Sequence, residues 1–479
     1  MRWWIGSAAA AYFLFFYRLT GTGLVGPDEP RYAWIGRAMA QSGDWITPRL
    51  WGEPWFEKPA LLYWMEAAAF RAGLGDDWAP RLPIAALSVA FLLFFYRRMR
   101  EEFGAPAAGY ASAVLATSAG WVGYSHAAVA DLPLAATFGA AMLSLLGWTE
   151  RRDGRAVTTF AVFLGLAALA KGLVAPALAA LTLACWALRA GAAPLGDFFR
   201  PLPALAFIAV AAPWYLLCWL RNGSGFLEEF FWKQHFSRYA LGALEHNQPV
   251  WFFLPVLAGA LLPWTPLVAL AGGLRWRDRR VWLLLSWAAA TLAFFSLSRD
   301  KLPGYILPAL PALAALAGVA LAGATSARPA LAACAATLAL MPAAAAVLPG
   351  ALDRGLGSVL GEMRFPPLAL AAVAVVSAGV WLAERAGRRS AAVAAVAAAA
   401  VVSYAVIKHI TFPAIEGRAG ARVLWQKARP HGDMICLGEI RRHLAYGLTY
   451  YAGRSLPRCD DEPKPYRIQN GEIVFDLAE

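Results

Sequence analysis

Ionisable side chains interrupt the apolar runs of this chain, and those with useful chemistry fall in only some of the breaks. They are Asp28, Glu29, Glu57, Lys58, Asp131, Lys171, His235, Arg238, Arg299, Lys301 and Tyr305. An ionisable group near a membrane is costly in free energy and indicates function. Carboxylates combined with cations and a phenol suit proton transfer and the binding of a phosphate.

Asp28 stands just before Pro30, where a helix is expected to begin, and apolar residues at helical spacing follow. One interpretation makes Asp28 the N-cap of an interfacial helix. The other makes it a carboxylate at the membrane boundary that accepts a proton from an acceptor hydroxyl, which is worth about 10²–10⁴ in rate. Glu29 is adjacent and is an alternative for the same role.

Two further acidic positions carry similar pairs of interpretations. Asp131 precedes Pro133 at the start of an apolar run, as either an N-cap or a second active-site acid. Glu57 and Lys58 precede a second expected interfacial helix at 59–70. They are either solvated charges at the start of that helix or part of the same site.

Cations and a phenol gather around the segment 298–308. Arg299, Lys301 and Tyr305 stand there at the entrance of an apolar helix, and Lys171 lies alone between two apolar runs. A phosphate or diphosphate on a lipid carrier needs cations, a hydroxyl donor and an apolar path for its tail. The alternative is that these residues are snorkelling anchors at a helix end.

The elements that position these residues are predicted to be membrane-spanning helices. The chain is 59% hydrophobic and 15% charged with a mean hydropathy of +0.50, which is a membrane composition. A spanning helix needs about 20 apolar residues. Thirteen candidate runs occur near 3–20, 81–96, 106–123, 132–149, 156–171, 172–188, 202–220, 250–272, 281–297, 303–322, 329–349, 366–383 and 391–410.

The distribution of arginine between the connections predicts how these helices are oriented in the membrane. The connections at 97–100, 151–155, 189–200, 275–280, 328 and 385–389 are arginine-rich, whereas the alternate short connections have few basic residues. By the positive-inside rule the first set is cytoplasmic, so the N-terminus is inside and the C-terminus outside. The segments 21–80 and 221–249 are then outer loops. The net charge of +12 thus reflects topology, and no nucleic acid is expected as a partner.

The tail at 411–479 is expected to be a small α/β domain outside the membrane, following a transmembrane domain at 1–410. Residues 434–437 and 473–475 are predicted to be strands and 441–452 a helix. Cys436 and Cys459 lie in this tail, where an oxidising compartment permits a disulfide, although no spacing rule decides whether they pair.

Eight motifs, in order over roughly the first 310 residues, resemble the bacterial aminoarabinose transferase branch of the protein-mannosyltransferase superfamily. They are Asp28-Glu29-Pro30-Arg31-Tyr32, Ser42-Gly43-Asp44-Trp45, Phe56-Glu57-Lys58-Pro59, the segment 126–133, Lys171-Gly172, Pro213-Trp214-Tyr215, the segment 231–238 and the segment 301–308. The resemblance implies a GT-C-type fold, here an all-α polytopic bundle with interfacial helices on its outer face.

The resemblance also implies a function and roles for residues. The function is transfer of a sugar from an undecaprenyl-phosphate-type carrier to a cell-envelope acceptor, such as lipid A or another glycan, outside the bacterial cytoplasmic membrane. Asp28 matches the catalytic acid of the first outer loop and Asp131 the second acid. Lys58, Arg238, Lys301 and Tyr305 match positions near the carrier phosphate, to which Lys171 and Arg299 are added from the charge pattern.

No cofactor is required by this reading, and the chain is expected to act as a monomer among membrane lipids. Some relatives hold a divalent metal near a Glu and a His of the outer loops, which here are Glu57 and His235, for Zn or Mg/Mn. The alternatives are a protein O-mannosyltransferase-like enzyme and a transporter or flippase of lipid-linked intermediates. A transporter would favour charges near the bilayer midplane and repeat symmetry, and neither is evident.

Overall fold

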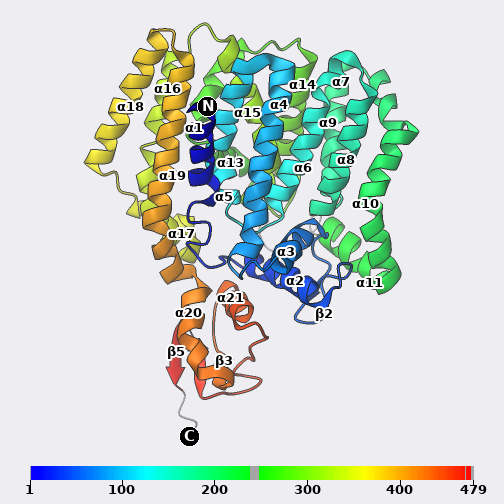
Figure 1. Cartoon of the computed structure of the whole chain (residues 1–479), viewed down its shortest axis with the longest axis vertical. Helices are drawn as coiled ribbons and strands as arrows, with labels where there is room; N and C mark the ends of the chain where they lie inside the picture. The colour runs from blue at the N-terminus through cyan, green and yellow to red at the C-terminus, as the bar shows by residue number, and fades with distance from the viewer. Residues whose placement is uncertain (1, 238–247, 470, 476–479) are drawn as a thin grey trace.

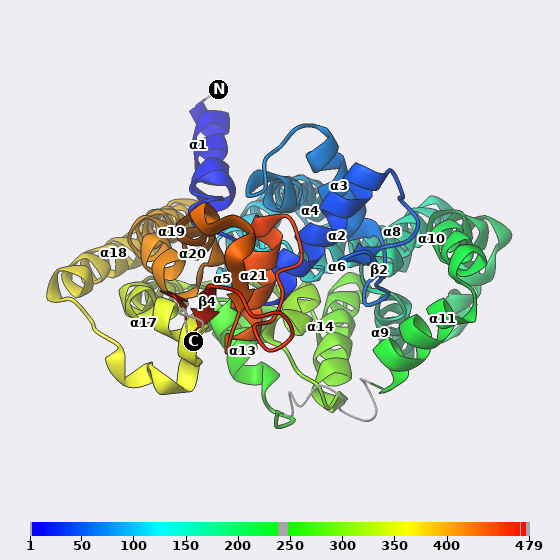
Figure 2. The same cartoon turned by 90° about the horizontal axis from the view of Figure 1, so that it is seen from below.

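A bundle of helices with two additions at one end makes up the computed structural model, which describes residues 2–237, 248–469 and 471–475 (Figure 1). The additions are the helices α2 (Asp28–Ser42) and α3 (Leu61–Arg71) and the C-terminal residues 420–475. Seen from below, these additions lie over the middle of the bundle (Figure 2). We call the end that they cover the capped face, and the opposite end the arginine face.

The bundle runs through most of the chain. Its first half contains α1 (Arg2–Ala11), η1 (Tyr12–Phe16), α4 (Trp78–Ala116), α5 (Ala119–Tyr124), α6 (Asp131–Ser144), α7 (Leu146–Arg151), α8 (Gly154–Lys171), α9 (Val174–Ala190), η2 (Ala193–Phe199), α10 (Pro201–Asn222), α11 (Ser224–Leu227) and η3 (Glu228–Ser237). Its second half contains α13 (Phe253–Ala260), η4 (Thr265–Gly273), α14 (Arg279–Leu297), η5 (Pro303–Ala309), α15 (Leu310–Gly323), α16 (Arg328–Thr337), α17 (Leu340–Arg354), η6 (Leu356–Ser358), η7 (Leu360–Glu362), α18 (Pro367–Arg385) and α19 (Arg389–Ala419).

Helices long enough to cross a membrane are numerous, as the composition predicts. Within the described residues, nine are long and apolar enough, and α13 with η4 forms a further pair bent by 95°. One of the nine, α4, contains two helices that meet at Gly104. Two shorter apolar helices, at 6–16 and 174–190, accompany them. Each of the thirteen predicted runs coincides with a helical segment, while the number of membrane crossings stays a prediction.

The arginine face is held together by one buried acid. Glu102 is fully buried, and Arg151 pairs with its carboxylate at 2.6 Å, with Arg98 at 3.6 Å. Arg280 donates to the main-chain carbonyl of the same residue. Arginines from three predicted inner connections therefore meet at one end of the bundle. The side of the membrane on which this end lies stays a prediction.

A short hairpin that the sequence analysis did not predict joins α2 to α3. Its strands β1 (Arg49–Leu50) and β2 (Glu53–Pro54) are antiparallel. Trp51 and Gly52 form the tip, both with positive φ. Since α2 and α3 pack closely against each other, this hairpin projects from the capped face beside them.

The C-terminal residues form a small α/β unit with an apolar cluster of its own. Its elements are α20 (Ala421–Ala428), η8 (Arg429–Met434), β3 (Ile435–Leu437), α21 (Arg442–Ala452), β4 (Tyr466–Gln469) and β5 (Glu472–Phe475). Strand β4 pairs in parallel with β3 and antiparallel with β5. Three of these elements were predicted, whereas β4 was missed. A disulfide joins Cys436 to Cys459, and α19 continues past residue 410 to Ala419.

Candidate active site

Asp28 is the first residue of α2, and its carboxylate is partly open to solvent. Pro27 is the N-cap of this helix, and no side chain caps it, so the N-cap interpretation of Asp28 is wrong. Arg31, one turn along the helix, pairs with the Asp28 carboxylate. The Asp28 side chain is 39% exposed, whereas that of Arg31 is 7% exposed. The Asp28 carboxylate is therefore open to solvent and is held in place by its ion pair with the buried Arg31.

Arg31 connects Asp28 to Glu57. Its guanidinium lies 3.0 Å from a Glu57 carboxylate oxygen, and Lys58 contacts the other oxygen at 2.9 Å. The Tyr32 hydroxyl is 3.4 Å from Glu57. Burial by itself lowers the pKa of Arg31, but the charges of Glu57 and Asp28 outweigh it and raise that pKa above its ordinary value. Arg31 therefore stays a cation at any physiological pH.

Glu29, next in sequence to Asp28, points the other way. Its buried carboxylate accepts from Arg81 Nη2 at 2.8 Å and from the main-chain N–H groups of Val25 and Ala128, both at 2.7 Å. These contacts tie the start of α2 to α4 and to the loop before α6. Glu29 is thus placed as a positioning residue and not to exchange roles with Asp28.

A second cluster forms around Asp131, the first residue of α6. Its N-cap is Ala130, again without a side-chain cap, so the N-cap interpretation is wrong here too. Lys171 Nζ lies 2.6 Å from the Asp131 carboxylate and 4.3 Å from the centre of the Tyr305 ring. The ammonium is placed by Gly172, whose φ of 69° ends α8 directly after Lys171 in a conformation that glycine favours.

Tyr124 links the two clusters. A Cβ built on Gly304 would lie 2.6 Å from the Tyr124 hydroxyl and 2.9 Å from the Asp131 carboxyl carbon, so these groups pack directly on Gly304. Burial raises the pKa of Tyr124, and the charges of Asp131 and then Asp28 add to the effect, with Tyr305 between them in size. The Tyr124 hydroxyl and Asp131 therefore pack together against Gly304 on the capped face of the bundle.

The other predicted phosphate-binding cations are placed differently. Lys301 is buried, and its ammonium donates to the main-chain carbonyls of Ser298 and Gln248, the second at 2.9 Å. These contacts fix the chain just before η5. Arg299 is exposed. Arg238 and the side chain of His235 lie outside the described residues, so their roles stay predictions.

The metal prediction also concerns Glu57. Among the described residues, no group of three or more His, Cys, Asp or Glu side chains is arranged to hold a metal. Both oxygens of the Glu57 carboxylate face cations, from Arg31 and Lys58. These cations offset the charge of the Glu57 carboxylate. Because the metal site also needs His235, it stays a prediction.

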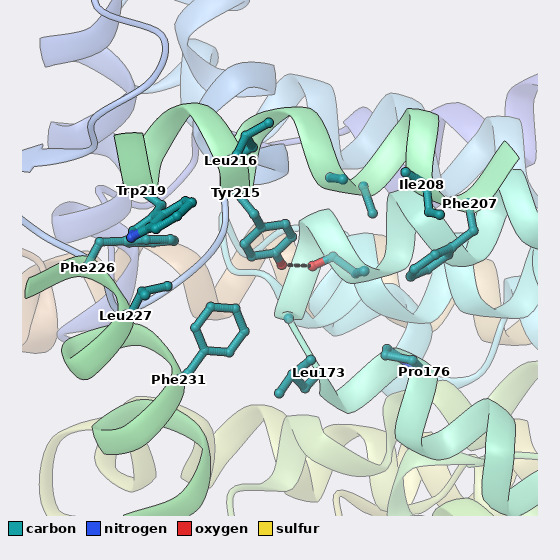
Figure 3. Close-up of a pocket in the computed structure, with 14 residues that line it drawn as sticks. Leu173, Pro176, Phe207, Ile208, Tyr215, Leu216, Trp219, Phe226, Leu227 and Phe231 are labelled. Atoms are coloured by element: carbon teal, nitrogen blue, oxygen red, sulfur yellow. Dashed lines mark hydrogen bonds between the residues drawn. The ribbon is translucent and has the colours of Figure 1, made fainter. Parts of the chain in front are cut away.

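An apolar groove of about 410 Å³ is lined in part by Gly172, the residue that follows Lys171 in the chain. It is lined by residues of α8, α9, α10, α11 and η3. Figure 3 shows the rings of Phe207, Tyr215 and Phe231 around it. The Tyr215 hydroxyl donates to the Ala168 carbonyl at 2.8 Å, which removes its polar group from the groove. The lining residues are Ala168, Gly172, Leu173, Pro176, Phe207, Ile208, Ala211, Ala212, Tyr215, Leu216, Trp219, Phe226, Leu227 and Phe231.

Comparison with known proteins shows which families and structures the chain is similar to. Residues 57–219 match the family described as dolichyl-phosphate-mannose-protein mannosyltransferase. The crystal structure of ArnT from Cupriavidus metallidurans bound to undecaprenyl phosphate is similar with a TM-score of 0.76 and 28% identity, over 95% of this chain and 85% of that one. The chain has the GT-C fold of ArnT and is similar to the aminoarabinose transferases.

Curated relatives of the chain are aminoarabinose transferases by name. Two proteins named undecaprenyl phosphate-alpha-4-amino-4-deoxy-L-arabinose arabinosyl transferase, from Pseudomonas fluorescens and Pseudomonas aeruginosa, are 35% and 36% identical. The alignments cover 64% and 63% of this chain and 54% and 56% of those proteins, so the chain spans about half the length of the curated relatives that it matches. An oligosaccharyltransferase from Archaeoglobus fulgidus, 15% identical with a TM-score of 0.50 over 95% of this chain and 63% of that one, shares the fold alone.

Three residues of this aminoarabinose transferase-like site were missed by the sequence analysis. Arg31 is three residues from Asp28, the helical spacing that brings two side chains together, and that signal was available. Arg81 stands at the start of an apolar run, where a charge is itself a signal. Tyr124 gave no such signal in the sequence, because its packing beside Asp131 on Gly304 depends on how α5 packs.

Proposed function

We propose that this chain is a glycosyltransferase that moves a sugar from a polyprenyl-phosphate carrier to a cell-envelope acceptor. The observation that carries the proposal is that Lys171 pairs with the acid Asp131 and is followed in the chain by Gly172 and Leu173, which line the apolar groove. A carrier with a long apolar tail and an anionic head matches that juxtaposition. The names of the relatives favour 4-amino-4-deoxy-L-arabinose on undecaprenyl phosphate as the donor. The proposed acceptor is lipid A or another glycan.

The proposed mechanism is a direct displacement at the anomeric carbon. Lys171 neutralises the carrier phosphate as the bond to the sugar breaks, and Asp131 and the Tyr305 ring keep the ammonium in place. Asp28 accepts the proton of a hydroxyl acceptor, or orients a phosphate acceptor that has no proton to lose. Attack in one step from the side opposite the leaving phosphate inverts the anomeric configuration.

The capped face is proposed to be the outer face of the bacterial cytoplasmic membrane. Arginines gather at the opposite end of the bundle, which the positive-inside rule places in the cytoplasm. The Cys436–Cys459 disulfide in the C-terminal unit supports an oxidising compartment on the capped side. The active site and the C-terminus are then periplasmic, and the N-terminus is cytoplasmic.

A transfer assay tests the function directly. The full chain in nanodiscs is supplied with undecaprenyl-phosphate-linked aminoarabinose and lipid A, and the product is measured by mass spectrometry. Aminoarabinose-modified lipid A is the expected product. Glycosylated peptide from a parallel reaction, without modified lipid A, would favour a protein O-mannosyltransferase-like enzyme. Movement of the donor across the bilayer without transfer would favour a flippase.

Filling the apolar groove is expected to weaken use of the long-chain donor. Ala212 lines the groove, so Ala212→Phe should place a ring where the carrier tail lies and raise the KM for the undecaprenyl donor about tenfold. A donor with a short, soluble prenyl chain should be affected less. Ala209→Phe is the control, because Ala209 is an exposed residue of the same helix outside the groove lining. An equal KM in both variants would contradict the assignment of the groove.

A methyl group added at Gly304 is expected to separate Tyr124 from Asp131. Gly304→Ala should lower the free energy of unfolding by about 1–3 kcal/mol, the usual range for overpacking. It should raise the activation free energy of transfer by at least the same amount. Thermal unfolding and transfer rate are measured together. Gly123→Ala serves as the comparison, because a Cβ there meets nothing within 4 Å. A fully active Gly304→Ala protein would show that this packing does not set the site.

A further inference from the structure

We propose that Trp51, Tyr446 and Arg442 form a subsite that binds an anionic saccharide, the acceptor, beside Asp28. Its role as the acceptor subsite rests on the proposed function. The three residues come from opposite ends of the chain, the hairpin between β1 and β2 and the helix α21 of the C-terminal unit. The subsite gives that unit a part in substrate recognition.

Trp51 is an exposed aromatic residue in a strained conformation. It has a φ of 54°, which non-glycine residues rarely adopt, and its side chain is 41% exposed. Its ring stacks on that of Tyr446 with centroids 5.4 Å apart and planes 27° apart. Strain combined with solvent exposure of a large apolar ring occurs where function requires it. The open part of the indole is a flat surface of the kind on which a sugar ring packs.

Arginines flank this pair of rings on the α21 side and on the α2 side. The Arg442 guanidinium lies 5.4 Å from the centre of the Tyr446 ring, and its Nε donates to the Tyr446 hydroxyl at 3.2 Å. The Arg31 guanidinium also lies 5.4 Å from that ring, and it is the cation that pairs with Asp28. The aromatic surface therefore continues directly into the proposed catalytic acid.

The chemistry of these groups specifies the ligand. Aromatic faces take up the C–H face of a pyranose, and a guanidinium binds a phosphate or carboxylate through two parallel hydrogen bonds. Arg442 is exposed and available for this. A saccharide that carries an anionic group satisfies both elements.

The position of the subsite indicates the acceptor and not the donor. In both views α2 lies between α21 on one side and α10 with α11 on the other (Figures 1 and 2). The apolar groove is on the α10 side, and Lys171 is the last residue of α8, which packs against α10. Asp28, at the start of α2, thus stands between a carrier site and a saccharide site, which is the order that a transfer reaction needs.

Direct binding tests the subsite without requiring transfer. Saturation-transfer NMR on the full chain in nanodiscs measures the binding of N-acetylglucosamine 1-phosphate and of N-acetylglucosamine. Trp51→Ala and Tyr446→Ala should each weaken binding of the phosphorylated sugar about five- to tenfold, the effect of losing one aromatic contact. Tyr446→Phe should retain binding. Arg442→Gln should reduce the affinity for the phosphorylated sugar to that for N-acetylglucosamine.

Matched controls make the result decisive. Trp78 is 42% exposed and Arg454 is an exposed arginine of the C-terminal unit, so Trp78→Ala and Arg454→Gln should leave binding unchanged. Absence of binding by the parent protein, or equal loss in Trp78→Ala, would overturn the subsite. In the transfer assay, Trp51→Ala should raise the KM for the acceptor and not for the donor. If the parent transfers sugar but Trp51→Ala leaves the KM for the acceptor unchanged, the subsite is refuted and the proposed function stands. If the parent binds the phosphorylated sugar but transfers nothing, the proposed function is refuted and the subsite stands.

Discussion

Asp28→Asn is expected to slow sugar transfer at least ~10²-fold, the low end for loss of a general base. An amide has nearly the size of the carboxylate but neither accepts the acceptor's proton nor carries its charge. The fold should survive, because the Asp28 side chain is partly exposed and caps no helix. The measurements are the transfer rate at saturating donor, donor binding and the unfolding temperature, on the same purified protein.

Asp76→Asn is the matched control for this experiment. Asp76 is an exposed acid of the capped face that also pairs with an arginine, Arg37, at 3.4 Å. It lies outside both clusters of the site, so its variant should transfer sugar at nearly the rate of the parent. If Asp28→Asn kept full activity, the role of the base would pass to Asp131.

The division of roles between Asp28 and Glu29 shows where sequence reasoning reaches its limit. The motif identified both acids but did not distinguish them, since neighbours in a chain share the same local pattern. Successive residues of a helix point about 100° apart, so one carboxylate faces the open site and the other faces Arg81. Which one faces inward depends on where α4 lies, and a pattern of residue types in one segment does not contain that information.

The helices themselves were predictable because composition decides them. Long apolar runs span a membrane whatever their detailed order, so the runs near 132–149 and 281–297 coincide with α6–α7 and α14. The pairing of Asp131 with Lys171 follows less directly, from two helix ends that meet on the same face. The carbonyl partners of Lys301 were not predictable from its motif, and its place near the carrier phosphate stays a prediction.

Contacts between distant parts of the chain could not be predicted from the sequence either, because a local pattern of residues does not show how distant segments pack. Tyr446 lies in a tail that the motifs do not cover, and only the packing of α21 on α2 brings it over Arg31. Tyr450 and Tyr451 of the same helix bind the segment just before α4, through the Asp76 carbonyl and the Asp77 carboxylate, each at 2.8 Å. These phenols anchor the C-terminal unit, and they leave Tyr446 directed toward the site.

The Glu29–Arg81 pair is expected to be the most sensitive point of the fold. Arg81 donates to the Glu29 carboxylate and also to the main-chain carbonyls of Thr22 and Gly23, at 2.7 and 2.8 Å. Both side chains are 5% exposed or less. Removing one partner of a buried ion pair leaves the other charge uncompensated, which typically costs about 3–5 kcal/mol.

Arg81→Met should therefore lower the free energy of unfolding by about 3–5 kcal/mol, because methionine fills most of the space and makes none of these hydrogen bonds. Unfolding in detergent measures the loss, and limited proteolysis within residues 21–30 reports whether the start of α2 has come away from α4. Arg97→Met is the control. The Arg97–Glu101 pair is as short, at 2.9 Å, but the Arg97 side chain is 78% exposed, and such surface pairs contribute about 0–1 kcal/mol. Equal stability of the two variants would mean that the buried pair does not hold α2 in place, and Asp28 would then owe its position to Arg31 and Glu57 alone.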